Sequence, residues 1–222
     1  MPLDWFPFWL SLRVAVIASV IAVPLGLWLA HILENREFRW KGVLEAAIAL
    51  PLVMPASVLG FFLLVLLGEG TILGRLYEWV LGAPLIFTWQ AAVVAALFHA
   101  IPLMVRQARE GFGRVDGAYL RAAQSLGASQ WRVFWKVTLP LEWRALAAAA
   151  VLAFARAFGD FGLTLMIAGN LPNKTQTLAV AVFDAAQKDS GRTARAFVLV
   201  LSATTLLVLF LVNRLERKRV RG

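Results

Sequence analysis

Long runs without charged residues dominate the hydrophobic pattern of this chain. The first run, 14–33, holds 20 residues without Asp, Glu, Lys or Arg, and a helix needs roughly 20 apolar residues to cross the core of a bilayer. Four later stretches have a similar length and composition. The pattern predicts an all-α, polytopic membrane protein with about five transmembrane helices, at 14–33, 46–68, 80–105, 145–168 and 196–213.

Some of these stretches carry features that refine the prediction. Gly82 and Pro84 favour a loop at the start of the third stretch, so we expect its helix to begin near Trp89. The fourth stretch contains two charged residues, Arg156 and Asp160. The first stretch is long and ends without a small-x-small cleavage pattern, so we interpret it as a retained span and not as a signal peptide.

Composition supports a membrane protein and limits the kinds of functional site that the chain can form. Hydrophobic residues make up 60% of the 222 positions and charged residues 16%, and the mean hydropathy is +0.74, which excludes an ordinary water-soluble fold. The chain has no cysteine and two histidines. Disulfide scaffolds, thiolate nucleophiles and cysteine-based metal sites are therefore excluded.

The Lys and Arg residues are unevenly distributed between the predicted spans. They number 22 against 13 Asp and Glu, a net charge of +9. With the carboxyl terminus in the cytoplasm, fifteen of these cations lie on the cytoplasmic side and five on the other, as the positive-inside rule requires. We therefore expect the amino terminus outside and the carboxyl terminus inside. Topology then accounts for the net charge, and we expect no nucleic-acid partner.

The long segment 106–140, between the third and fourth spans, has the pattern of two short helices. Apolar and small residues recur from Val115 to Leu126 at three- and four-residue spacing, and Gly127 can end this first helix. Ser129 can cap the second helix, which we expect to stop at Pro140. The result would be a compact cytoplasmic lobe, either an interfacial connector or a docking element for another protein.

In the same segment, Arg121-Ala122-Ala123 is followed after three residues by Gly127 and after nine more by Val137-x-Leu139-Pro140. This pattern resembles the EAA motif of ABC-importer permeases, which is written E-A-A, three residues, G, nine residues, I-x-L-P. The spacing matches throughout, with Arg at the acidic position and Val at the Ile position. The resemblance implies a coupling helix held by a separate ATP-binding subunit, whereas the Arg leaves open whether an ion pair forms there. The matching residues, and the expected coupling residues, are Arg121, Ala122, Ala123, Gly127, Val137, Leu139 and Pro140.

A second resemblance runs from about Leu10 to the carboxyl end. The block 155–162 and the residues that follow it, up to 177, are similar to molybdate-transporter permease subunits, with Asp160 in place of the usual Glu. The segment 51–55, with Gly60 after it, resembles the second span of the same family. The resemblance implies the ABC importer permease fold, one transmembrane domain over 1–222 without an appended regulatory domain, and a place in the inner membrane.

This resemblance also implies an energy source and partners. The chain has no G-x-x-x-x-G-K-[ST] loop to hold the phosphates of ATP, so we expect ATP and Mg to be bound by a partner subunit. We expect no catalytic residue, cofactor or metal in this chain. The implied partners are the ATP-binding subunit, an external oxyanion-binding protein, a second copy of the chain and the lipid bilayer.

Helix-breaking and polar residues in the second predicted span are candidates for a pathway or gate. Pro51, Pro55, Ser57 and Gly60 can free backbone groups there, and such groups are tolerated only against a cavity or neighbouring protein. Kinking and packing of the helix explain the same residues equally well.

Charged and ionisable residues within the spans form a second candidate set. Arg156 and Asp160 are four apart, so they can pair within the membrane. We interpret them as an interface or gating pair, because Asp160 would repel an anion. We expect His31 and His99 to serve packing or local hydrogen bonding. The polar stretch 169–195 faces out, with a short helix at 177–187 that either contacts a delivery protein or only connects spans.

The preferred interpretation is the membrane subunit of an ABC importer for molybdate, and alternatives remain. The first is an importer for tungstate or for sulfate and thiosulfate, ions that resemble molybdate in shape and charge. A channel or secondary transporter would require internal repeats with matched broken helices, and we find no convincing duplication. An intramembrane enzyme would need a convergent set of acid, base or metal groups, which the pair in the fourth span does not supply.

Overall fold

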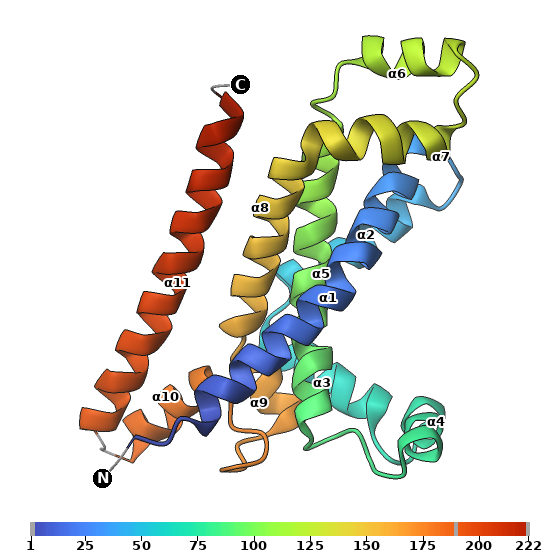
Figure 1. Ribbon diagram of the computed structural model, residues 1–222. Coiled ribbons are helices and arrows are strands. Elements are labelled where there is room, and N and C mark those ends of the chain that lie inside the picture. The colour runs from blue at the N-terminus through green and yellow to red at the C-terminus, as the bar shows by residue number, and fades with distance from the viewer. Residues whose placement is uncertain (1–2, 189–190, 221–222) are drawn as a thin grey trace.

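Long helices frame the part of the chain that the computed structural model describes, residues 3–188 and 191–220, with the backbone alone for 215–220. They run between the two ends of a helical bundle, and the marked termini lie at opposite ends (Figure 1). The long helices are α1 (Phe6–Asn35), α5 (Trp89–Phe112), α8 (Leu139–Phe158) and α11 (Gly191–Val220).

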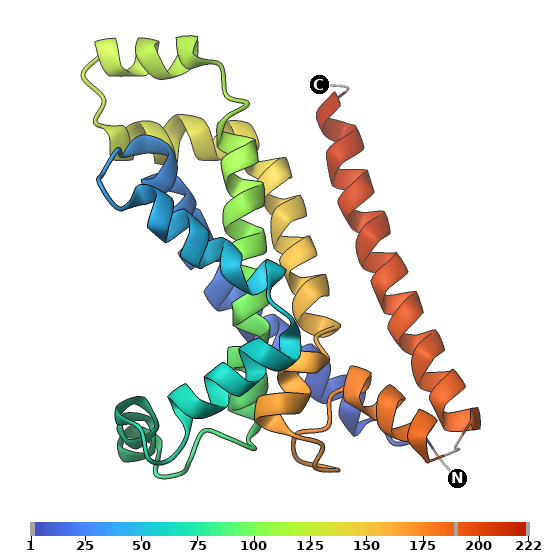
Figure 2. The same ribbon diagram turned by 180° about the vertical axis from the view of Figure 1, so that it is seen from behind.

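Shorter helices fill both ends of the bundle and the space beside α5. At the end marked by the amino terminus lie α4 and α10, while α6 projects beyond the opposite end (Figures 1 and 2). The shorter helices are α2 (Lys41–Val53), α3 (Ala56–Leu67), α4 (Ile72–Leu81), α6 (Gly117–Ser125), α7 (Gln130–Val133), the π-helix η1 (Phe134–Thr138), α9 (Gly162–Ala168) and α10 (Leu178–Gln187).

Small side chains hold α1 and α5 close together at the centre of the bundle. Gly26 of α1 faces Met104 of α5 so closely that an added Cβ would lie 2.6 Å from the Met104 Cγ atom. Small residues allow helix backbones to approach in a membrane, where packing replaces the hydrophobic effect as the main attraction. The alanines of this contact are fully buried: Ala15, Ala18, Ala22, Ala30, Ala91, Ala92, Ala95, Ala96, Ala100 and Ala108.

The second predicted span, 46–68, is interrupted at Met54 and Pro55. The chain bends by 116° between α2 and α3, because Met54 and Pro55 are both extended, with ψ angles of 140° and 133°. A residue that precedes proline is pushed out of the helical region. The segment is therefore a broken span or a re-entrant loop, and the helix α4 that follows it was not predicted.

The fourth predicted span, 145–168, is also interrupted. Helix α8 ends at Phe158, Gly159 and Asp160 form the break, and α9 begins at Gly162. The broken segments meet, since α3 packs against α9. Two of the five predicted spans are thus interrupted in the structure, and the interruptions lie where polar or proline residues occur within apolar sequence.

The other spans follow the prediction more closely. Helix α5 begins at Trp89 as expected, although it continues to Phe112, beyond the predicted end. Among the described residues, four helices are long and apolar enough to cross a membrane, or five if α2 and α3 count as one span. The expected helix at 177–187 is present as α10. It is apolar and packs against α1 and α11, so this part of 169–195 is less polar than expected.

Candidate functional site

The helix α6 stands apart from the bundle. None of its residues is buried, and both views show it beyond the ends of α5 and α7 (Figures 1 and 2). Asp116 caps its amino end by accepting a hydrogen bond from the Ala118 amide at 2.8 Å. Gly127 follows its carboxyl end with a φ of +78°, a left-handed conformation that favours glycine. An exposed helix with defined caps is suited to contact another molecule.

The motif residues are divided between this helix and the segment that leads back to the bundle. Arg121, Ala122 and Gly127 are exposed and Ala123 is half-buried. Val137 and Leu139 are half-buried at the junction with α8, and Pro140 is exposed. The structure therefore places the first part of the motif on a free surface and the last part in the connection to a long helix.

The expected stop of the second short helix at Pro140 is wrong. Ser129 caps α7 by accepting from the Arg132 amide at 3.3 Å, and α7 continues through η1 into α8 without a break. Pro140 follows η1 directly and lies inside this continuous helix, so it removes one main-chain hydrogen bond without ending the helix. A continuous helical segment, residues 130–158, thus joins the α6 lobe to the bundle, and we call this segment the rod.

Aromatic rings fasten this rod to the ends of α1 and α5. The ring of Phe134 in η1 lies 4.3 Å from the His31 ring of α1 and 5.5 Å from the Phe112 ring of α5, between centroids. Trp131 of α7 stacks on Phe134 at 5.7 Å. His31 therefore serves packing, together with a 3.0 Å hydrogen bond between its Nδ1 atom and the Asn35 side chain. Movement of the rod must displace both helix ends.

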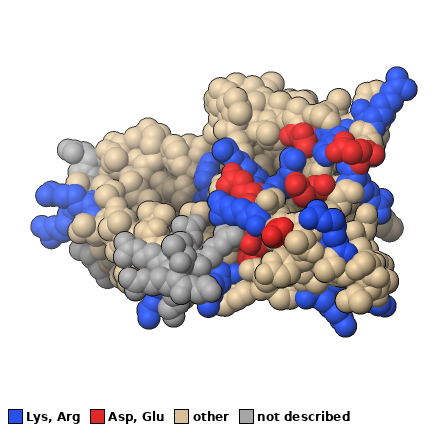
Figure 3. Space-filling model, turned by 90° about the horizontal axis from the view of Figure 1, so that it is seen from above, with Lys and Arg blue, Asp and Glu red and all other residues tan. Residues whose placement is uncertain are grey.

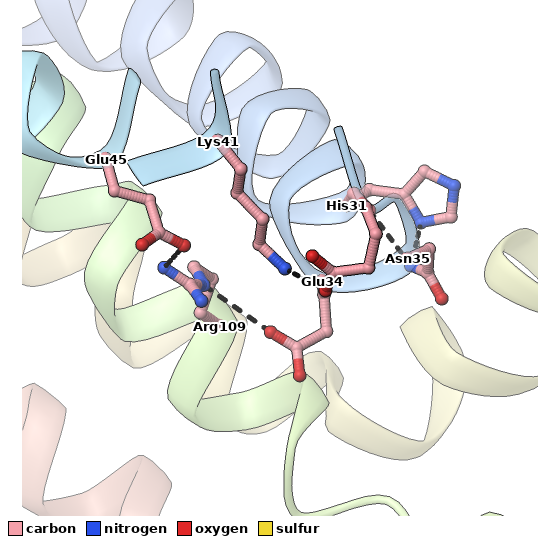
Figure 4. A network of polar contacts seen from close by, with 7 residues as sticks. His31, Glu34, Asn35, Lys41, Glu45 and Arg109 are labelled. Carbon is pink, nitrogen blue, oxygen red and sulfur yellow. Dashed lines mark hydrogen bonds and ion pairs between the residues drawn. The ribbon is translucent and has the colours of Figure 1, made fainter. Parts of the chain in front are cut away.

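Ion pairs join α1, α2 and α5 at the same end of the bundle. The Arg109 guanidinium lies 2.9 Å from Glu45 and 3.4 Å from Glu34, and Lys41 pairs with Glu37 at 2.6 Å (Figure 4). The Arg109 and Glu45 side chains are about one-third exposed. They border a groove of about 550 Å³ between these helices. Sequence reasoning missed the Arg109 pairs, because Arg109 is far from Glu34 and Glu45 in the chain.

The end that carries α6 is rich in charge. Seen from that end, positive and negative side chains are interspersed over the surface (Figure 3). Mixed charge of this kind is favourable only in contact with water or with a polar partner, since a charged side chain is costly in the bilayer core. This face therefore lies outside the hydrocarbon region.

A buried carboxylate lies at the break between α8 and α9. Asp160 is 3% exposed, and its Oδ1 atom is 2.9 Å from the Nδ1 atom of His99 on α5 and 3.1 Å from the Arg156 guanidinium. Its Oδ2 atom accepts hydrogen bonds from the backbone amide of Thr164 at 3.0 Å and from the Thr164 hydroxyl at 2.8 Å. The interrupted span is thereby tied to α5.

These contacts decide what Asp160 can do chemically. All four of its donors approach one carboxylate, so little acceptor capacity remains, and a negative group cannot attract an anion. The Thr164 amide belongs to the first turn of α9, so the carboxylate also satisfies a free donor at that helix start. His99 was expected to make a local hydrogen bond, and its partner proves to be Asp160. The arrangement is suited to holding the break in place.

The pathway candidates of the second span divide into two groups. Pro51 and Gly60 are buried, whereas Pro55 and Ser57 are exposed at the bend. Gly60 serves close packing, because an added Cβ would lie 2.5 Å from the Met166 Cβ atom of α9. Pro55 and Ser57 are the members of this set that a solute or a neighbouring chain can reach.

Comparison with known proteins gives the geometry a context. Residues 22–221 match the family described as "Binding-protein-dependent transport system inner membrane component". The molybdenum transport system permease protein ModB of Escherichia coli (strain K12) is 36% identical over 221 residues, which cover 97% of this chain and 96% of ModB. The ModB protein of Haemophilus influenzae is 38% identical over 219 residues, covering 96% and 95% of the two chains.

A sulfate permease and a solved structure are also similar. The sulfate transport system permease protein CysT of Escherichia coli is 33% identical over 210 residues, covering 94% of this chain and 75% of CysT. An inward-facing structure of the MetNI methionine ABC transporter matches with a TM-score of 0.69 at 16% identity, covering 96% of this chain and 94% of that chain. At that identity the structural match supports the fold alone.

Proposed function

Because the chain belongs to the family of binding-protein-dependent transport system inner membrane components, we propose that it is the membrane-spanning subunit of an ABC importer for molybdate. The similarity to ModB proteins along almost the whole of both chains carries this proposal. CysT is 33% identical, so sulfate and thiosulfate, with tungstate, form the second candidate group of ions. The tetrahedral oxyanion is the chemistry shared by all of these substrates.

The α6 lobe is the proposed contact with the ATP-binding subunit. Tyr119 and Leu126 are 60% and 88% exposed around the motif residues, and an exposed Leu of this kind gains from burial in a partner. ATP and Mg then belong to that partner, and this chain contributes no catalytic group. Nucleotide binding would move α6, and the continuous α7–η1–α8 rod would carry the movement to the interrupted span at Asp160.

A second copy of the chain is the proposed partner on the side of the broken second span. Helices α2, α3 and α4 expose a long apolar face, with Val53 84%, Ile72 80% and Trp79 83% accessible. Lipid or protein must cover a face of this size. A pair of chains related by twofold symmetry would enclose a central path between them, with Pro55 and Ser57 near it.

The proposed orientation has the α6 end in the cytoplasm and the amino terminus outside. Support comes from the two termini at opposite ends of the bundle (Figure 1) and from the excess of Lys and Arg in the segments at the α6 end. An external binding protein would then deliver the oxyanion to the end that carries α4 and α10. Each ligand shifts the balance between outward and inward states only by binding one of them more tightly.

Cellular molybdenum measured by elemental mass spectrometry tests the assignment of the ion. A strain without this gene should lose molybdenum at trace molybdate, and complementation should restore it even with excess sulfate. Tungstate added as a competitor ranks the two ions, because cellular molybdenum falls further the better tungstate competes for the transporter. Restored uptake of sulfate instead of molybdate would reassign the substrate while leaving the importer fold in place.

A further inference from the structure

A pocket lies at the end of the bundle opposite α6, between the start of α1, the start of α5 and the loop before α10. Its volume is about 510 Å³. Its lining combines apolar and aromatic side chains with amide and hydroxyl groups and two cations. The residues that line it are Phe6, Trp9, Leu10, Arg13, Phe87, Thr88, Trp89, Gln90, Asn173, Lys174 and Thr175.

The cations of this pocket have no anionic partner in the described part of the chain. The Arg13 guanidinium rests over the Trp89 ring, with its Cζ atom 3.9 Å from the ring centroid. Neither Arg13 nor Lys174 takes part in an ion pair among the described residues, and no Asp or Glu lines the pocket. Two cations without a carboxylate favour an anionic ligand.

Arg13 also lies on a face of α1 that is otherwise apolar and exposed. Trp9, Val16 and Val20 share this face at three- and four-residue spacing, and they are 62%, 46% and 68% exposed. Exposed apolar side chains on a spanning helix face lipid, and tryptophans mark the headgroup level. Arg13 is two turns from the start of α1, so its charge lies near the boundary between headgroups and acyl chains.

The walls of the pocket are held in fixed positions. Phe87 and Asn173 have φ angles of 61° and 58°, a conformation that is costly for a side chain as large as Phe. A hydrogen bond from the Phe87 amide to the Ile167 carbonyl, 2.9 Å long, holds the first of them. The pocket is therefore a built feature of the fold and not a chance hollow between loose loops.

We propose that this pocket binds the phosphate headgroup of an anionic phospholipid, with Arg13 and Lys174 on the phosphate and an acyl chain over Trp9 and Phe6. A lining that combines apolar rings with two cations suits an amphiphile, whereas a free oxyanion would gain nothing from the apolar part. The bound lipid would fix the start of α1 against α5 and the loop before α10. The proposal does not depend on which ion the protein transports.

Native mass spectrometry of the purified full-length chain in neutral detergent tests the site, with phosphatidylglycerol and phosphatidylcholine as probes. The wild type should retain phosphatidylglycerol in preference to phosphatidylcholine. Each cation near a membrane surface contributes a factor of about five, so Lys174→Gln should weaken phosphatidylglycerol binding about fivefold and the Arg13→Gln/Lys174→Gln pair more than tenfold. Lys174 is exposed on a loop, so the single variant tests the site even if the pair fails to fold.

The matched control is the Arg75→Gln/Lys188→Gln pair, which removes two cations from the same end of the bundle, outside the pocket. Its phosphatidylglycerol binding should equal that of the wild type. The proposal would be overturned if the pocket variants bound phosphatidylglycerol as well as the wild type does. It would also be overturned if the control pair lost as much binding as the pocket variants. Excess sodium molybdate or inorganic phosphate should leave the lipid in place, and displacement by either would assign the pocket to a free oxyanion instead.

Discussion

The Nδ1 atom of His99 lies 2.9 Å from the Oδ1 atom of Asp160, although 61 positions separate the two residues in the chain. This contact joins the uninterrupted helix α5 to the break between α8 and α9. Both side chains are almost fully buried, where a charge is tolerated only with partners. The contact, together with Arg156 and Thr164, explains how a span can be interrupted inside a membrane without an unsatisfied carboxylate.

Replacement of Asp160 by Ala should be strongly destabilising. It removes the acceptor of four hydrogen bonds and leaves His99 and Thr164 buried without a partner, a loss of about 3 kcal/mol. Glu37→Ala is the control, because it removes an exposed carboxylate that pairs with Lys41, worth less than about 1 kcal/mol. Melting in detergent compares the two variants, and equal melting temperatures would contradict the role given to Asp160.

Gly60→Ala should separate α3 from α9. The new Cβ would lie 2.5 Å from the Met166 Cβ atom, so backbone must shift at a cost of about 1–3 kcal/mol. Gly42→Ala makes the same change in α2, where nothing lies within 4 Å, and should leave stability unchanged or slightly higher. The melting temperatures of the two purified variants test this prediction. If Gly60→Ala melted at the temperature of the wild type, the helices would not be in contact at this point.

Arg109 and Glu45 should show energetic coupling. A double-mutant cycle with Arg109→Gln and Glu45→Gln should give a coupling energy of about 0.5–1 kcal/mol, since the side chains are 2.9 Å apart and partly shielded from water. Arg106 pairs with Glu110 instead, so the Arg106→Gln/Glu45→Gln cycle should be additive. Both cycles are measured from the free energies of unfolding in detergent. If the effects of Arg109→Gln and Glu45→Gln were additive, the ion pair would not link α2 to α5.

Gly127→Asp should weaken the contact with the ATP-binding subunit. Nothing lies within 4 Å of the added Cβ atom within this chain, so the new charge would project from the proposed docking surface. Gly127→Asn is the control, because Asn adopts a positive φ about as readily as Asp and carries no charge. Co-purification should fall at least tenfold for Asp and much less for Asn. Equal recovery of the partner with both variants would argue against docking at α6.

Much of the fold could be predicted because the bilayer imposes it. Charge-free runs of about 20 residues located α1, α5 and α11, and the spacing around Gly127 located the α6 lobe. The runs carry no information on direction, however, so the size of the bend at Pro55, where the sequence indicated only helix-breaking residues, was not predicted. The break at Gly159 was not predicted either. The role of Pro140 was also predicted wrongly, because this proline lies within a continuous helix without ending it.

The candidate sites depend on contacts that a single sequence does not display. Arg156 and Asp160 were recognised together because a helical repeat separates them. His99 and Thr164 complete the same cluster. Because His99 lies on another helix, its position in the sequence does not indicate that it contacts Asp160. The Arg109 pairs were missed for the same reason. Local patterns therefore indicated where polar groups lie in the membrane, and only the packed helices show which of them meet.

The most direct test of the account is ATP-dependent uptake of radiolabelled molybdate by proteoliposomes that hold this chain with its ATP-binding subunit, supplied with the external binding protein. The account predicts uptake that requires ATP, persists in excess sulfate and is lost with Gly127→Asp but retained with Gly127→Asn. Uptake without ATP, or in the absence of the ATP-binding subunit, would contradict it.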